Sequence, residues 1–137
     1  MKVQEIMSTK VETIQPHLSL RAAARSLSSH GVGALPVVKE GELLGIITDR
    51  DVSVYAIAIG RDPQNTEVQA VMTKTVFTCF EDQNLAEAAE IMQEHGVRRL
   101  VALNRNDEIT GFITVDDLAR VSHELTGAVL VAAKPLH

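Results

Sequence analysis

The chain has 137 residues, of which 45% are hydrophobic and only 3% aromatic, so it can bury a core, but an aliphatic one. A formal net charge of −5 argues against nucleic acid as a partner. No apolar run reaches the ~18 residues that span a membrane, and the first residues lack the apolar segment of a signal peptide. We therefore expect a cytoplasmic protein without a membrane partner. The single Cys79 excludes an internal disulfide and a cysteine-rich zinc site.

The sequence is an imperfect duplication. Residues 3–7 return as residues 68–72, and His30-Gly31-Val32 returns as His95-Gly96-Val97, both 65 residues later. Two copies of a small unit can bury a shared face and form two related clefts. We predict one domain made of two repeats, 1–65 and 66–137, with cores near 7–60 and 72–125.

The first repeat begins with a short helical lead that ends at Met7, and alternation predicts a strand over 11–14. Apolar residues at helical spacing predict a helix from about 20 to 30, and Gly31 suits the left-handed residue after its end. Two almost wholly apolar strands follow, over 34–38 and 43–47, with a turn between them. A second helix is expected after Thr48, ending near Gly60.

The second repeat gives the same order: a lead ending at Met72, a strand over 76–79, a helix closed by Gly96, strands over 100–103 and 109–113, and a helix after Thr114. The predicted fold class is therefore mixed α/β (α+β), with two β-α-β-β-α repeats related by a pseudo-twofold axis. The tail from Gly127 to His137 is apolar at first, and no element is predicted for it.

The sharpest motif, Gly-apolar-apolar-Thr-x-x-Asp, occurs at 45–51 and again at 111–117, where a strand becomes a helix. One interpretation is a capping box, in which threonine and aspartate satisfy each other's amides. The other is a nucleotide site. Helix amides and the threonine hydroxyl would hold a phosphate, the aspartate would accept from ribose hydroxyls, and Arg50 would add a charge. Both interpretations stay open.

Together these segments resemble a tandem cystathionine-beta-synthase (CBS) domain pair, or Bateman module, over about residues 3–125. The resemblance rests on the Met7 and Met72 leads, on the two His-Gly-Val segments (30–38 and 95–100), and on the two threonine–aspartate turns. The linker at 60–63 is similar to that of short stand-alone bacterial members, including the hypoxic-response type. The resemblance implies a regulatory module that binds an adenosyl ligand: AMP, ADP, ATP, NAD or S-adenosylmethionine.

The resemblance also implies two ligand sites, each shared between the repeats. One joins Thr48, Arg50 and Asp51 to Met72, Phe77, Thr78, Val97 and Arg98. The other joins Thr114, Asp116 and Asp117 to Met7, Glu12, Thr13, Val32 and Gly33. Because Asp116 stands where the first copy has Arg50, we predict that an anionic phosphate prefers the Thr48 site.

The remaining polar residues have simpler interpretations. His30 and His95 end matching helices, where they can meet terminal carbonyls. Arg98 and Arg99 begin a strand, so alternation predicts that Arg98 faces the ligand and Arg99 the opposite side. No catalytic residues, catalytic cofactor or metal site are predicted.

Three functions remain in order of preference. The first is a regulatory module that acts on an unidentified protein or on its own oligomer. The second is a ligand-free structural or interaction dimer whose turns only cap helices, and an enzyme ranks last. The second helices of both repeats look too apolar for a monomer, which predicts a homodimer built by those helices and shaped as a flat four-repeat disc.

Overall fold

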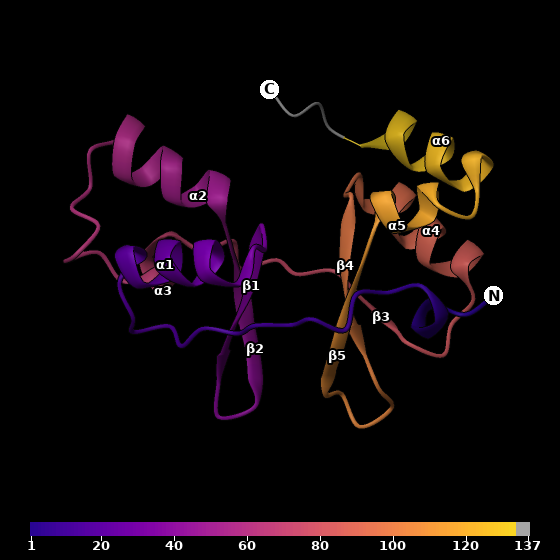
Figure 1. Ribbon diagram of the computed structural model, residues 1–137, viewed down its shortest axis with the longest axis horizontal. Coiled ribbons are helices and arrows are strands. Elements are labelled where there is room, and N and C mark those ends of the chain that lie inside the picture. Colours follow the sequence, from indigo (N-terminus) through magenta and orange to yellow (C-terminus); the bar gives the residue numbers. More distant parts are fainter. Residues whose placement is uncertain (134–137) are drawn as a thin grey trace. The chain divides into compact units, whose positions relative to one another are not determined.

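The computed structural model describes residues 1–133 and divides into two compact units (Figure 1). The first-repeat unit is Glu12–Val76, and the second-repeat unit combines Met1–Val11 with the chain from Phe77 onward. Residues 134–137, including His137 of the expected tail, lie outside the described residues. The mixed α+β fold class with tandem repeats is confirmed.

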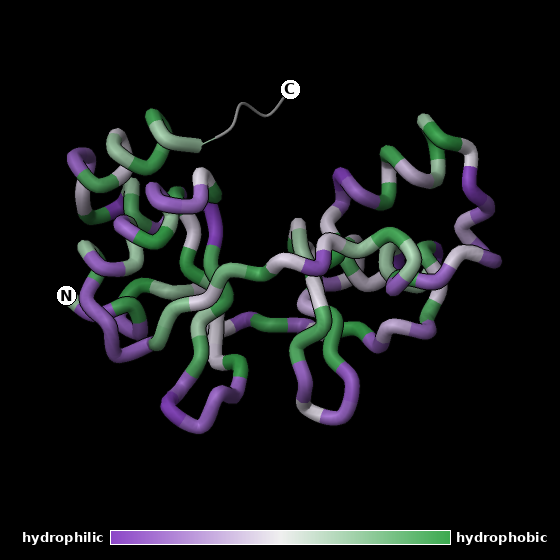
Figure 2. The backbone as a smooth tube through the Cα atoms, turned by 180° about the vertical axis from the view of Figure 1, so that it is seen from behind, coloured by the Kyte–Doolittle hydropathy of each residue, from purple (hydrophilic) through white to green (hydrophobic). Residues whose placement is uncertain are grey.

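The first-repeat unit contains a β-hairpin with helices packed on it. In chain order its elements are α1 (Leu20–His30), β1 (Ala34–Lys39), β2 (Glu42–Thr48), α2 (Asp49–Ser53), the π-helical turn η2 (Val54–Ala58) and α3 (Val68–Val71). Strands β1 and β2 pair antiparallel around a turn at Glu40-Gly41, where both residues have positive φ. This turn geometry matches the twist of the strands, and the hairpin tip is hydrophilic in Figure 2.

The second-repeat unit has the same core order and one more helix. It consists of η1 (Val3–Glu5), β3 (Thr78–Phe80), α4 (Leu85–His95), β4 (Arg99–Leu103), β5 (Ile109–Thr114), α5 (Val115–Ala119) and α6 (His123–Ala132). Strand β4 lies between β3, to which it is parallel, and β5, to which it is antiparallel. Helix α6 packs on α4 and α5.

Local signals explain the long helices in both units. Ser19 and Asn84 cap α1 and α4 by accepting hydrogen bonds from Ala22 N and Glu87 N at 3.1 and 3.0 Å. Gly31 and Gly96 end these helices in the left-handed conformation, each at φ 63°, as predicted.

Each lead packs in the unit of the other repeat's core. Ser8, from the first lead, exchanges two backbone hydrogen bonds of 2.9 Å with Phe112 of β5. Thr73, from the second lead, does the same with Ile46 of β2. The repeats are therefore continuous in sequence, whereas each packed unit combines the core of one repeat with the lead of the other.

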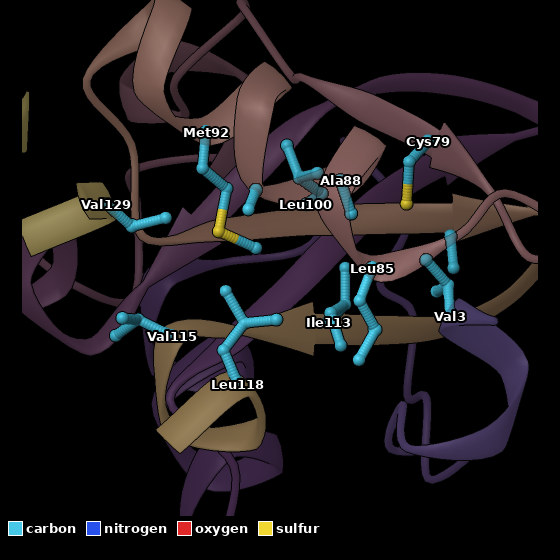
Figure 3. Close-up of a cluster of buried hydrophobic side chains, with 12 residues drawn as sticks. Val3, Cys79, Leu85, Ala88, Met92, Leu100, Ile113, Val115, Leu118 and Val129 are labelled. Carbon is cyan, nitrogen blue, oxygen red and sulfur yellow. The ribbon is translucent and has the colours of Figure 1, made fainter. Parts of the chain in front are cut away.

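Each unit has its own aliphatic core. In the second-repeat unit, Val3 from the lead, Leu100 and Ile113 from the sheet, and Leu118 and Val129 from the helices are buried in one cluster (Figure 3). Cys79 is in the same cluster, and burial raises the pKa of its thiol to about 11. In the first-repeat unit, Val68 and Val71 of the second lead complete the cluster.

The predicted strand over 11–14 is wrong. Only a single parallel bridge forms there, between Ile14 and Val37, whereas the matching segment of the second repeat is β3. The next ladder bond would need a backbone N–H at Pro16, which proline lacks. At the matching position Glu81 donates its N–H to the Leu103 carbonyl at 2.8 Å.

No element was predicted for the tail from Gly127, whereas α6 begins at His123 and extends into it as far as Ala132. The apolar face expected on the second helix of the second repeat is covered at Leu118, which is fully buried in the cluster that includes Val129 of α6, whereas Ala119 and Val121 are exposed.

Candidate functional site

Both threonine–aspartate turns form capping boxes. Thr48 Oγ1 accepts from Asp51 N at 3.1 Å, and Asp51 Oδ2 accepts from Thr48 N at 3.0 Å. Thr114 and Asp117 make the same reciprocal bonds at 3.3 and 2.9 Å. Both turns therefore act as helix N-caps, each in its own unit.

The two turns differ in how much hydrogen-bonding capacity they retain. The Thr114 hydroxyl donates to Asp117 Oδ2 at 3.1 Å, and Arg120 donates to Asp117 Oδ1 at 3.3 Å. Asp117 is only 6% exposed. Within residues 1–133, by contrast, the Thr48 hydroxyl donates to no acceptor and Asp51 Oδ1 accepts no hydrogen bond. Asp51 is also more exposed than Asp117, so only the Thr48 turn keeps a donor and an acceptor for another molecule.

Arg120 is a neighbour of the second turn that the motif did not predict. It lies three residues after Asp117 on the C-terminal side of α5, at the spacing where oppositely charged helix side chains meet. That spacing is the signal that would have identified it. Its counterpart position in the first repeat is Val54, which cannot neutralise Asp51.

The two methionines occupy matching positions against the glycine of the motif. A Cβ on Gly45 would lie 2.8 Å from the Met72 sulfur and 2.7 Å from the Thr73 carbonyl oxygen. A Cβ on Gly111 would lie 2.8 Å from the Met7 sulfur and 2.6 Å from the Ser8 carbonyl oxygen. In this structure the motif glycines are required by close packing of the leads on the hairpins.

The other predicted residues of the first-repeat unit are Arg50, Glu12, Thr13, Val32 and Gly33. Arg50 is exposed in the first turn of α2. The carbonyl of Gly33 accepts from Asp49 N at 3.1 Å, which holds the start of β1 against the start of α2. Glu12 Oε1 lies 3.6 Å from His30 Nε2, and His30 Nδ1 lies 2.9 Å from the Ser26 carbonyl, the helix-end contact predicted for this histidine. Thr13 is exposed, and Val32 packs against the core.

In the second-repeat unit, Phe77 stacks on His95 with ring centroids 3.9 Å apart. His95 therefore lies at the end of α4 and also stacks on the ring of Phe77. Thr78 begins β3, and Val97 packs against the core.

A hollow of about 280 Å³ adjoins the start of α5, lined by Arg98, Arg99, Thr114, Val115 and Asp116. Arg98 Nε is buried and has no hydrogen-bond partner among residues 1–133. Both arginines line this hollow, whereas strand alternation predicted opposite faces. Arg98 precedes β4, which begins at Arg99, so its direction is not fixed by the pleat.

Another ion pair joins the turn between β4 and β5 to the segment that follows β3. Arg105 donates to both carboxylate oxygens of Asp82, at 2.9 and 2.8 Å, and its guanidinium lies 4.0 Å from the Phe80 ring centroid. The hydrogen bonds from Arg105 lower the pKa of Asp82. Among residues 1–133, no three His, Cys, Asp or Glu side chains are grouped as metal ligands, and no helix is long and apolar enough to cross a membrane.

The family model that matches this chain, and several of the proteins similar to it, are of the CBS domain type. The CBS domain family model matches residues 3–57 and again 68–124. The chain is 36% identical over 130 residues to the CBS domain-containing protein YhcV of Bacillus subtilis, covering 93% of this chain and 91% of YhcV. It is 30% identical over 118 residues to hypoxic response protein 1 of Mycobacterium tuberculosis, covering 85% of this chain and 82% of that protein.

A solved structure bears on the ligand. The CBS domain pair of protein MJ0100, crystallised with 5-methylthioadenosine and S-adenosyl-L-methionine, superimposes with a TM-score of 0.76. It is 28% identical to this chain, and the match covers 88% of this chain and 98% of that one.

Proposed function

Because this chain belongs to the CBS domain family as a tandem pair, we propose that it is a sensor module that binds an adenosine-containing ligand. CBS pairs are in general regulatory modules that bind ligands. The observation that carries the proposal is the structure of the CBS domain pair of MJ0100, which is in complex with two kinds of adenosyl ligand, 5-methylthioadenosine and S-adenosyl-L-methionine. AMP, ADP and ATP are the first candidate ligands here, with NAD and S-adenosylmethionine next. The proposal assigns no catalysis to the chain.

The Thr48 turn is the preferred point of attachment in this proposal. A ribose presents vicinal hydroxyls as donors, and the unengaged Asp51 Oδ1 is an acceptor. The Thr48 hydroxyl and Arg50 supply a donor and a charge for a phosphate. At the Thr114 turn a ligand would have to displace Arg120 from Asp117. The proposal includes the two ligand sites predicted around Thr48 and Thr114. It also includes the division of the chain into CBS motifs 1–65 and 66–137.

Thermal unfolding with a panel of adenosyl ligands tests this proposal, because a ligand that binds only the native state must raise the melting temperature. At a ligand concentration of 100 times Kd the native state gains about 2.7 kcal/mol. Isothermal titration of Asp51→Asn with the best ligand should then show affinity lowered about tenfold or more. Asp49→Asn is the matched control, because Asp49 is an exposed acid in the same helical turn.

Asp117→Asn provides the comparison between the two turns. If binding is lost in Asp117→Asn and kept in Asp51→Asn, the preference for the Thr48 turn is wrong. If no adenosyl ligand changes the melting temperature, the second candidate function gains: a structural module in which the turns only cap helices. The completed capping boxes at both turns favour that second candidate.

We propose that ligand binding regulates either a second protein that binds this chain or the self-association of the chain. A bound ligand that stabilises one arrangement of the repeats shifts the population toward it and changes what the chain binds.

A further inference from the structure

The four methionines of the chain differ in how far they are exposed. Met1 is 64% exposed, whereas Met92 is fully buried in the core of the second-repeat unit, among the side chains drawn in Figure 3. Met7 and Met72 are partly buried, and each packs against the core of its unit. They end the two leads at matching positions, so they mark the seams where a lead meets a hairpin.

The sulfur of each lead methionine lies where a side chain on the motif glycine would project. Met72 Sδ and Cγ lie 2.8 and 3.1 Å from the Cβ position of Gly45. Met7 Sδ and Cγ lie at the same distances from the Cβ position of Gly111. An oxygen added to either sulfur on the glycine side would therefore overlap the backbone of the hairpin.

The backbone groups along both seams are already paired. Ile46 and Thr73 exchange two hydrogen bonds of 2.9 Å, and the Thr73 carbonyl oxygen lies 2.7 Å from the Cβ position of Gly45. Ser8 and Phe112 exchange the same two bonds at the other seam. A sulfoxide oxygen is a hydrogen-bond acceptor, and the amides of these four residues already donate to carbonyls. An acceptor that enters such a seam without a donor costs free energy.

The leads carry core residues of the units in which they pack. Val68 and Val71 of the second lead are buried in the first-repeat unit, and Val3 of the first lead is fully buried in the second-repeat unit. Each methionine lies within four residues of these side chains along the chain. A change at one partly exposed sulfur is therefore transmitted to the core of a whole unit.

We propose that Met7 and Met72 are oxidation sites at which a peroxide loosens the leads. The thioether sulfur attacks one oxygen of hydrogen peroxide, so that an S–O bond forms and the O–O bond breaks. The sulfur is oxidised by two electrons, and the other oxygen leaves as water with both hydrogens of the peroxide. The product, methionine sulfoxide, is polar where the thioether was apolar, and such a change disrupts packed contacts.

The two sites act on different units. Oxidation of Met72 weakens the first-repeat unit, and oxidation of Met7 weakens the second-repeat unit, because each lead packs on the core of the other repeat. This role is separate from adenosyl binding.

Treatment of the full chain with hydrogen peroxide, without ligand, tests the proposal. Peptide mapping by mass spectrometry assigns each added oxygen to a residue, and circular dichroism follows the thermal unfolding of the same samples. We expect Met1 to be oxidised first, Met7 and Met72 next and Met92 last, in the order of their exposure. The melting temperature should stay constant while only Met1 is oxidised, and fall by about 4–8 °C once Met7 and Met72 are. Burial raises the pKa of the Cys79 thiol to about 11, so this thiol should react slowly.

Leucine variants separate oxidation at the seams from other damage. The double variant Met7→Leu with Met72→Leu keeps apolar side chains of similar volume, and neither can be oxidised. Its melting temperature should not respond to peroxide, although Met1 is still oxidised. Met92→Leu is the matched control, because it removes a methionine outside the seams. Compared with its own untreated sample, it should keep the wild-type response.

Two further measurements need no peroxide or reverse its effect. Met72→Gln places a polar group of similar length at the seam and should melt about 4–8 °C below Met72→Leu. Methionine sulfoxide reductase with a dithiol returns the thioether, releasing the oxygen as water while the dithiol becomes a disulfide. This treatment should restore the melting temperature of the oxidised wild type.

Four results would overturn the proposal. The first two are Met7 and Met72 left intact after Met1 is fully oxidised, and both oxidised without a change in melting temperature. The third is an equal loss of stability in the double leucine variant. The fourth is oxidation of Met92 as fast as Met72, which would mean that peroxide acts on the unfolded chain. Because no ligand is present, a failure here leaves adenosyl binding to be judged by the titrations above.

Discussion

At Gly45 and Gly111 a lead packs directly against a β-hairpin, with no room for a Cβ. Gly45→Ala should lower the free energy of unfolding by about 1–3 kcal/mol, because the added methyl meets a backbone carbonyl that cannot move aside. Gly127→Ala is the control, since Gly127 lies in α6 with no atom near its potential Cβ. It should raise stability by about 0.5–1 kcal/mol. Urea unfolding measures both, and an unchanged stability in Gly45→Ala would contradict the packing argument.

We expect Cys79 to lower the free energy of unfolding at alkaline pH. Burial raises the pKa of its thiol to about 11, above that of a thiol in the unfolded chain. Between these two values the unfolded state loses a proton that the native state keeps, so the stability present at lower pH is lost as pH rises. The unfolding free energy of the wild type relative to Cys79→Ala should decrease by about 1 kcal/mol between about pH 8 and about pH 10. A constant difference would contradict it.

Residues of the candidate site were predictable to different degrees. The threonine–aspartate spacing identified two helix starts, and both capping boxes formed. The inequality between the turns was predicted from the Arg50 and Asp116 exchange. The structure adds a separate difference: Arg120 donates to Asp117, whereas Val54 at the matching position offers Asp51 no basic side chain. That difference lies outside the motif and therefore escaped a comparison restricted to it.

At the scale of elements, α6 is held by one buried contact surface. Val129→Ala should cost about 1–3 kcal/mol, because it removes methyl groups that are fully enclosed between α4 and α5. Val131→Ala, two residues later on the exposed side, should change stability by no more than about 0.5 kcal/mol. Thermal unfolding compares the two. Equal effects would mean that α6 is not docked as described.

The elements that sequence patterns predicted are those with strong local signals. Helices α1 and α4 have apolar spacing and a closing glycine, and the hairpins have turn residues between apolar runs. Helix α6 lacked such a signal because it is apolar on several sides, including the exposed Leu130 and Val131. The strand over 11–14 failed for the opposite reason: its alternation was correct, but Pro16 removed the next donor. No pattern in the repeats shows on which copy a lead will pack.

At the scale of the whole molecule, the exchange of leads determines which fragments fold. A fragment of residues 12–76 contains the entire first-repeat unit, whereas residues 1–65 lack Val68 and Val71, which complete its core. The two fragments have the same length, which controls for size. We expect cooperative thermal unfolding for 12–76 and a disordered circular-dichroism spectrum for 1–65. A folded 1–65 fragment would show that the second lead is dispensable.

The exchange of leads also bears on how such a chain could have arisen. A half-length ancestor with this packing could complete its core only by lending its first residues to another molecule and borrowing that molecule's in return. Its folding would then have depended on concentration. With both copies in one polypeptide, the encounter is intramolecular, at an effective concentration fixed by the connecting segment. Completion of each core in the duplicated chain therefore does not depend on protein concentration.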